Sequence, residues 1–133
     1  RDLVLRKERD IPSGHNPDDY VVKRLMAPAA DGETIPISLM YHKDMPPSSE
    51  RPLQLYGYGA YGMSMSPSFS SVRLSLVDRG ITYAMTHIRG GQEKGYRWYR
   101  EGREEVVPKG AVIFSLLDLW TFVRHLPRAH HEG

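Results

Sequence analysis

Residues 55–62 read Leu-Tyr-Gly-Tyr-Gly-Ala-Tyr-Gly and constrain the fold more than any other part of this chain. The apolar run at residues 52–55 leads directly into them, which predicts a strand that ends in a glycine-rich turn. Glycine adopts backbone conformations closed to other residues and lets a ligand or a second segment approach closely. The hydroxyls of Tyr56, Tyr58 and Tyr61 are hydrogen-bond donors there. Such a turn can stabilise a developing oxyanion, and the alternative is a tyrosine-rich hairpin turn.

A second strand and turn follow at an informative distance. Residues 80–88 are β-prone and mostly apolar, and they end in Arg-Gly-Gly at 89–91. Between the two motifs, the length of residues 70–79 and the stop at Gly80 favour a helix. The order strand, turn, helix, strand, turn predicts a β-α-β unit, in which the two strands are parallel and the crossover is right-handed.

The segment before this unit predicts a hairpin. Residues 20–26 and 34–41 have the composition of strands, and Asp31-Gly32 between them is a hairpin signal. After the unit, residues 92–101 predict a short helix whose aromatic side chains pack or face a cleft.

The N-terminus predicts a domain boundary. Leu-Val-Leu at residues 3–5 suggests a short strand, and residues 8–19, with two prolines and a glycine, suggest a linker. We therefore expect residues 1–12 to be the end of one domain with its linker, and residues 13–133 to belong to a second domain.

Taken in order, these motifs resemble the prolyl oligopeptidase family of serine peptidases, and within it the oligopeptidase B branch. The resemblance covers residues 4–102. A lone Arg-Gly-Gly is common, but the ordered set at this spacing is specific. It consists of Tyr-Gly-Tyr-Gly-Ala-Tyr-Gly at 56–62, Leu-Ser-Leu-Val-Asp-Arg-Gly at 74–80, His-Ile-Arg-Gly-Gly at 87–91, and Glu93, Gly95, Trp98, Tyr99 and Gly102.

The resemblance implies a two-domain enzyme in which a β-propeller gates an α/β-hydrolase domain with a Ser-Asp-His triad. This α/β chain would then hold the end of the propeller and the N-terminal part of the hydrolase domain. The resemblance also implies that Tyr58 donates a hydrogen bond to the oxyanion, together with the backbone amide after the nucleophile. The substrates would be short peptides, cleaved after arginine or lysine.

The sequence contains no Gly-x-Ser-x-Gly, the elbow that exposes the nucleophile in α/β-hydrolases. In this fold the chain order is nucleophile, Asp, His, so we expect all three beyond Gly133 and the sequence to be a fragment without peptidase activity of its own. Two alternatives stay open. One is a catalytically inactive, hydrolase-like binding or regulatory protein, and the other is a different α/β-hydrolase such as an esterase, although esterases usually carry His-Gly-Gly at this place.

Other residues near the two turns have both a functional and a structural interpretation. Arg89 can bind a substrate carbonyl or carboxylate, but such an arginine more often pairs with a nearby acid to hold a loop. Tyr61 and Trp98 can line a substrate pocket, although aromatic residues more often pack in a core. His87 is expected to be a satisfied core histidine, and Glu93 a loop or helix-cap acid.

The loop at residues 63–69 contains no acidic residue. Some bacterial members of the branch carry acids there, where a basic substrate residue could be recognised. This segment therefore gives no support for a second basic subsite.

Composition narrows the functional classes. The 133 residues suffice for one ordinary domain, and a net charge of +2 is too mild to predict nucleic-acid binding. The absence of cysteine excludes disulfides and thiolate metal sites, and we expect no cofactor. No secretory signal is recognisable, which favours the cytosol. The apolar run at 111–126 is shorter than a membrane span, so we expect no membrane partner.

Residues 103–133 depart from the family. A reading-frame or splice-junction change near Val106 is one hypothesis, and ordinary divergence of a buried helix is the alternative. His125, His130 and His131 lack the His-Glu-x-x-His spacing of a zinc site. We also expect the chain alone to be poorly stable, because the nucleophile strand would normally cover the edge at residues 80–88.

Overall fold

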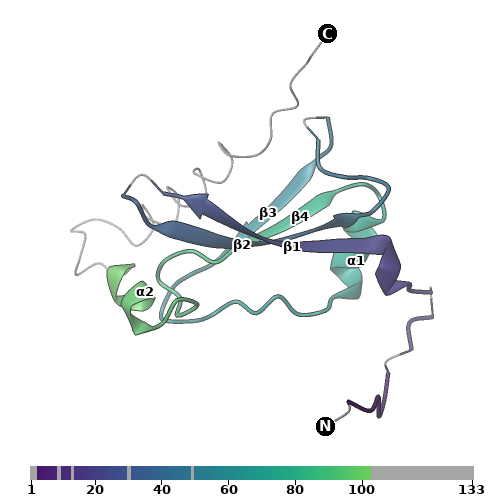
Figure 1. Cartoon of the computed structure of the whole chain (residues 1–133), viewed down its shortest axis with the longest axis horizontal. Coiled ribbons are helices and arrows are strands. Elements are labelled where there is room, and N and C mark those ends of the chain that lie inside the picture. Colours follow the sequence, from purple (N-terminus) through teal and green to yellow (C-terminus); the bar gives the residue numbers. More distant parts are fainter. Residues whose placement is uncertain (1–2, 9, 13, 30, 49, 103–133) are drawn as a thin grey trace.

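The structure, a computed structural model, describes residues 3–8, 10–12, 14–29, 31–48 and 50–102. It contains one four-stranded mixed sheet with the strand order β1-β2-β4-β3, flanked by two short helices (Figure 1). The strands are β1 (Tyr20–Pro28), β2 (Thr34–His42), β3 (Leu53–Gly57) and β4 (Thr82–Thr86).

The predicted hairpin is present. β1 and β2 pair antiparallel from Tyr20 opposite His42 to Pro28 opposite Thr34, so both strands run slightly longer than expected. Gly32 turns the chain with a φ of 85°, a conformation that favours glycine. The prediction from Asp31-Gly32 is therefore confirmed.

The β-α-β unit is also present. β3 pairs parallel with β4 from Leu53 opposite Thr82 to Gly57 opposite Thr86, and α1 (Ser71–Val77) lies between them in the chain. Ser70 caps α1, because its hydroxyl accepts a hydrogen bond of 3.4 Å from the Arg73 amide. Since β3 continues into a parallel crossover, the interpretation of the Tyr-Gly motif as a hairpin turn is wrong.

β4 lies in the interior of the sheet, and every one of its residues is buried. It pairs antiparallel with β2 on one side and parallel with β3 on the other. The expectation of an open edge at residues 80–88 is therefore wrong, because β2 returns to pair with the side of β4 that β3 leaves free. Among the described strands, β1 and β3 are the edges.

Alternating side chains divide the core between the two faces of the sheet. Ile37, Leu39 and Tyr41 of β2 gather with Ala84 of β4 in one apolar cluster. On the other face, Tyr83 and Met85 of β4 pack with Val77, which α1 contributes. The period of two along β2 produces this division.

The N-terminal segment corrects one prediction. Residues 3–8 have no regular structure, and Leu3, Val4 and Leu5 are exposed, so the predicted short strand is wrong. A strand needs a neighbour, and none of the described strands pairs with these residues. The 3-10 helix η1 (Pro17–Asp19), capped by the Asn16 side chain, leads into β1. The domain boundary and the propeller end stay predictions.

The helix predicted at 92–101 is shorter than expected. Gly95 has a φ of 88°, and α2 (Tyr96–Glu101) begins after it. No helix in the described part of the chain is long and apolar enough to cross a membrane. The described residues also contain no group of three or more metal-ligating side chains. The hypotheses on residues 103–133, including the three histidines there, fall outside the described residues.

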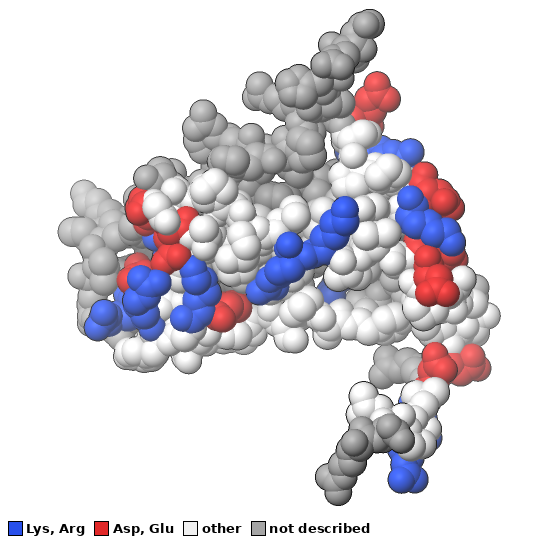
Figure 2. Space-filling model, viewed as in Figure 1, with Lys and Arg blue, Asp and Glu red and all other residues white. Residues whose placement is uncertain are grey.

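Ion pairs tie the tip of the β1–β2 hairpin to α2 and to the loop before it. Glu33 pairs with Lys94 at 2.5 Å and with Arg97 at 2.6 Å. Acidic and basic side chains accordingly gather at the end of the molecule where α2 lies (Figure 2). The hydrogen bond from Lys94 is the main reason that the pKa of Glu33 falls to about 2.

This pKa predicts a specific loss of stability in acid. A carboxylate whose folded pKa lies below its unfolded value of 4.5 contributes stability above pH 4.5, and that contribution is lost as the pH falls toward about 2. Glu33→Gln should therefore lower the free energy of unfolding by about 1–2 kcal/mol at pH 7, a value reduced for solvent screening, and by much less near pH 2. Chemical denaturation across this range measures the difference. The exposed Glu50→Gln is the control, and a constant gap between wild type and Glu33→Gln at all pH values would contradict the prediction.

Candidate active site

Tyr58 lies directly after the last residue of β3, at the carboxyl end of the parallel pair. Gly57 pairs with Thr86 at the end of the ladder, and the Thr86 hydroxyl donates a 3.1 Å hydrogen bond to the Tyr56 carbonyl. The Tyr58 side chain is half-buried. In open α/β sheets, ligands bind at the carboxyl ends of the strands. Tyr58 therefore lies at the edge of the sheet where ligands bind in this class of fold, and its role as an oxyanion donor stays a prediction.

Two glycine turns touch each other at this end of the sheet. The Tyr-Gly turn (residues 58–62) and the Arg-Gly-Gly turn (residues 89–91) are joined by a 2.9 Å hydrogen bond from the Gly62 amide to the Gly90 carbonyl. A Cβ on Gly59 would lie 2.6 Å from the Ile88 carbonyl oxygen, and a Cβ on Gly90 would lie 2.1 Å from the Gly59 oxygen. The two backbones approach so closely that neither position has room for a side chain.

α2 packs on the outside of the Arg-Gly-Gly turn. Trp98 is fully buried, and its indole N–H donates to the Ile88 carbonyl at 3.1 Å and to the His87 carbonyl at 3.3 Å. The Trp98 carbonyl accepts a 3.1 Å hydrogen bond from the Gly90 amide. At the end of α2, a Cβ on Gly102 would lie 2.2 Å from that same amide nitrogen. The interpretation of Trp98 as a core residue is therefore confirmed.

Arg89 is 5% exposed and forms an ion pair with Asp31 from the hairpin tip. This interaction lowers the pKa of the Asp31 carboxyl. The guanidinium carbon also lies 5.8 Å from the centroid of the Trp98 ring, within cation–π range. The structure thus contains the loop-holding pair that the sequence offered as the alternative for Arg89, and a substrate contact by Arg89 stays a prediction.

Tyr61 is 88% exposed, and among the described residues other than glycine it alone has a positive φ, of 54°. Left-handed backbone is costly for a bulky residue and is concentrated at functional sites. Tyr61 projects from the same turn as Tyr58 without packing in the core. Its role as a substrate contact stays a prediction.

Behind the turns, His87 and Glu93 face each other in the protein interior. His87 is 1% exposed, and its Nε2 lies 2.9 Å from an Arg24 guanidinium nitrogen and 2.9 Å from the Ser38 hydroxyl. A guanidinium only donates, so Nε2 accepts and the neutral ring carries its proton on Nδ1, which lies 3.7 Å from a Glu93 oxygen. Burial, and then the charge of Arg24, lower the pKa of His87.

Glu93 fastens the chain that leaves the Tyr-Gly turn. Its Oε1 accepts a 2.8 Å hydrogen bond from the Met65 amide, which confirms the prediction of a loop acid. The sequence predicts that His87 is a core histidine whose ring nitrogens both have hydrogen-bond partners. This is true of Nε2, whereas Nδ1 has no hydrogen-bond partner among the described residues. The sequence carried no signal that His87 and Glu93 meet, because their contact depends on how the loop folds back over the strand end.

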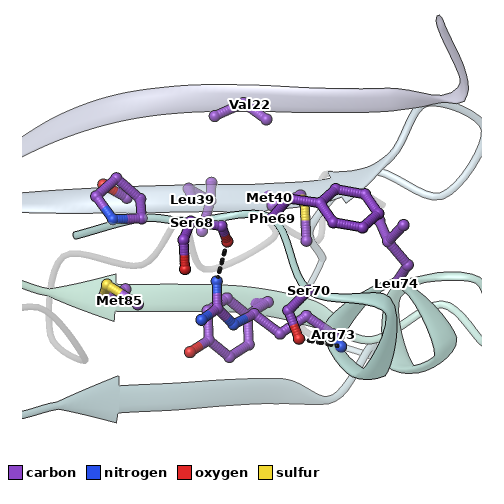
Figure 3. A pocket seen from close by; sticks show the side chains of 12 residues that line it. Val22, Leu39, Met40, Ser68, Phe69, Ser70, Arg73, Leu74 and Met85 are labelled. Atoms are coloured by element: carbon purple, nitrogen blue, oxygen red, sulfur yellow. Dashed lines mark hydrogen bonds between the residues drawn. The ribbon is translucent and has the colours of Figure 1, made fainter. Parts of the chain in front are cut away.

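A separate apolar groove of about 220 Å³ lies beside α1 (Figure 3). Met40, Tyr83 and Met85 of the sheet line it, and Phe69 closes one side. Arg73 is the one charged residue among the twelve described residues that line it, and it donates a 2.6 Å hydrogen bond to the Ser68 carbonyl. Tyr58 and Tyr61 do not line this groove, so it is distinct from the turns.

Comparison with known proteins finds relatives that agree with the family resemblance seen in the sequence. Residues 67–110 match the prolyl oligopeptidase family. Dipeptidyl aminopeptidase BI of Pseudoxanthomonas mexicana is 48% identical over 98 residues, which cover 73% of this chain and 13% of that protein. The chain thus spans about an eighth of the length of that relative.

Solved structures of oligopeptidase B resemble the chain in three dimensions. The enzyme from Leishmania major has a TM-score of 0.78 and 39% identity. The match covers 89% of this chain and 16% of the Leishmania chain. The closed form from Trypanosoma brucei with covalently bound antipain has a TM-score of 0.80 and 38% identity. The match covers 90% of this chain and 16% of the Trypanosoma chain.

The contact between the two turns predicts unequal costs for two glycine substitutions. Gly90 has a φ of 105° and Gly95 a φ of 88°, so alanine is strained at both positions, but only at Gly90 would its Cβ also collide with backbone. Gly95, with a ψ of −178°, lies in a region essentially confined to glycine, so Gly95→Ala should cost about 1–3 kcal/mol of unfolding free energy. Gly90→Ala should cost clearly more. Thermal or chemical unfolding of the two variants measures this, and equal losses would argue against a rigid contact.

Proposed function

Because this chain belongs to the prolyl oligopeptidase family of serine peptidases, we propose that it forms the N-terminal part of the α/β-hydrolase domain of an oligopeptidase and supplies its oxyanion-binding tyrosine. The observation that supports this is the position of Tyr58. It follows a strand at the carboxyl end of a parallel pair, in a turn held against a second turn by backbone contacts. The likeness to oligopeptidase B at a TM-score of 0.78 supports the same assignment.

The reaction would proceed by acyl transfer. A serine in the part of the enzyme outside this sequence attacks the peptide carbonyl while its histidine takes the proton as general base. The carbonyl oxygen becomes an oxyanion, to which the Tyr58 hydroxyl donates a hydrogen bond alongside the backbone amide after the nucleophile. A donor fixed before the reaction stabilises this charge without reorganising, which is why such groups contribute strongly to catalysis.

We further propose cleavage of short peptides after arginine or lysine, on the strength of the resemblance to the oligopeptidase B branch and the 38–39% identity to two of its structures. Prolyl endopeptidases are also among the relatives, at 36% identity for that of Elizabethkingia meningoseptica. Matched peptides with arginine, lysine or proline before the scissile bond separate the two specificities in the intact enzyme. Faster hydrolysis after proline would overturn the basic specificity.

The oxyanion role predicts the kinetic effect of removing one hydroxyl. In the intact enzyme that contains this chain, Tyr58→Phe should lower kcat by about 100- to 1,000-fold, since loss of one oxyanion donor costs about 2.7–4 kcal/mol of transition-state stabilisation. KM should change little, because the oxyanion forms only in the transition state. Steady-state kinetics measure both constants.

Tyr96→Phe is the matched control, because Tyr96 is exposed on α2 and belongs to neither turn. It should leave kcat unchanged. If Tyr58→Phe also leaves kcat unchanged, Tyr58 has no part in the mechanism.

The exposed and strained Tyr61 predicts a different pattern. Tyr61→Gly removes a substrate-contacting ring and relieves the positive φ, so KM should rise several-fold while kcat stays the same and thermal stability does not fall. Tyr61→Ala removes the ring and keeps the strain, and should raise KM equally. An unchanged KM in both variants would exclude Tyr61 from substrate binding.

A further inference from the structure

We propose that Trp98 is a positioning residue that sets the location of the Tyr58 hydroxyl through two layers of backbone. This inference rests on the proposed function, because it assigns a role to Trp98 in the same oxyanion site. Trp98 itself does not reach the substrate. It acts through residues 87–90, which in turn support the Tyr-Gly turn.

The first layer is the end of β4. Both ladders of β4 end at Thr86, and just past them the His87 amide still donates to the Pro36 carbonyl of β2 at 2.9 Å. The carbonyls of His87 and Ile88 have a different partner. Both are in the buried part of the structure and both accept from the Trp98 indole N–H, at 3.3 Å and 3.1 Å. Buried carbonyls need such a partner. The indole, together with the hydrogen bond from the His87 amide to Pro36, therefore fixes the direction in which the chain leaves the strand.

The second layer is the contact between that chain and the Tyr-Gly turn. The hypothetical Cβ of Gly59 lies 2.6 Å from the Ile88 carbonyl oxygen and 2.7 Å from Ile88 Cγ1, so the Gly59 backbone rests directly on Ile88. Gly59 immediately follows Tyr58. Because close-packed interiors transmit displacement, a shift of the Ile88 carbonyl must displace Gly59 and with it Tyr58.

The far side of the Tyr-Gly turn is held as well, in part through Gly90, whose amide donates to the Trp98 carbonyl at 3.1 Å. The Gly62 amide donates to the Gly90 carbonyl at 2.9 Å, and the Met65 amide donates to Glu93 at 2.8 Å. Trp98 thus supports the turn at two places, through the Ile88 carbonyl beside Gly59 and through Gly90, which contacts both Gly59 and Gly62. Through these two contacts Trp98 influences the position of Tyr58.

Trp98→Phe tests this in the intact enzyme, because phenylalanine keeps an aromatic ring in the core and removes only the N–H and part of the packing. We expect kcat to fall about 10-fold with little change in KM, since a displacement of 1 Å can cost about 100-fold in rate. In a Tyr58→Phe background, the same substitution should lower kcat less than 2-fold, because residues that act as one unit are strongly non-additive.

Two further variants separate positioning from loss of stability. Val77→Ala removes buried side-chain volume at the end of α1, away from both turns, and should lower the melting temperature without changing kcat. Ile88→Ala removes the Cγ1 that contacts Gly59 and should lower kcat about 2- to 3-fold, again only when Tyr58 is present. This second variant is measured in place of Trp98→Phe if Trp98→Phe does not fold.

The outcomes distinguish the two proposals. Equal loss from Trp98→Phe with and without the Tyr58 hydroxyl, or no loss at all, would overturn the positioning role while leaving the oxyanion role intact. If Tyr58→Phe alone has no effect on kcat, the oxyanion role fails and a role of Trp98 through Tyr58 fails with it.

Discussion

The backbone contact between Gly59 and Gly90 is the constraint on which the candidate site depends. A Cβ on Gly90 would come within 2.1 Å of the Gly59 oxygen, so the two turns can meet only where both chains lack side chains. The parallel pairing of β3 and β4 brings the turns to the same edge of the sheet. The contact restrains the backbone next to Tyr58. A donor that is held before the reaction is what oxyanion stabilisation requires.

Charged groups reinforce this arrangement from outside. The hairpin tip reaches across to the site, where Asp31 pairs with the buried Arg89 and Glu33 pairs with Lys94. Lys94 and Arg89 both lie within cation–π range of the Trp98 ring, at 4.6 Å and 5.8 Å. A hairpin distant in sequence thus helps to hold the turn that supports Tyr58.

Local patterns in the sequence predicted the hairpin, the β-α-β unit and the position of Tyr58, because glycine turns, Asp31-Gly32 and apolar runs act over a few residues. The order of the strands could not be predicted in this way. β4 lies inside the sheet because β2 pairs with it, and that pairing joins segments more than forty positions apart in the chain. The contact of Glu93 with His87 and the hydrogen bonds of Trp98 were missed for the same reason. They depend on tertiary approach and leave no local signal.

The hydrogen bond from Tyr58 to the oxyanion would be visible in a crystal structure of the intact enzyme with a peptide aldehyde bound to the nucleophilic serine. Such an adduct places an oxygen where the oxyanion forms. The Tyr58 hydroxyl should lie about 2.7–3.1 Å from that oxygen, the distance expected of an oxyanion donor. A Tyr58 hydroxyl turned away from the adduct, with another side chain donating in its place, would contradict the oxyanion role.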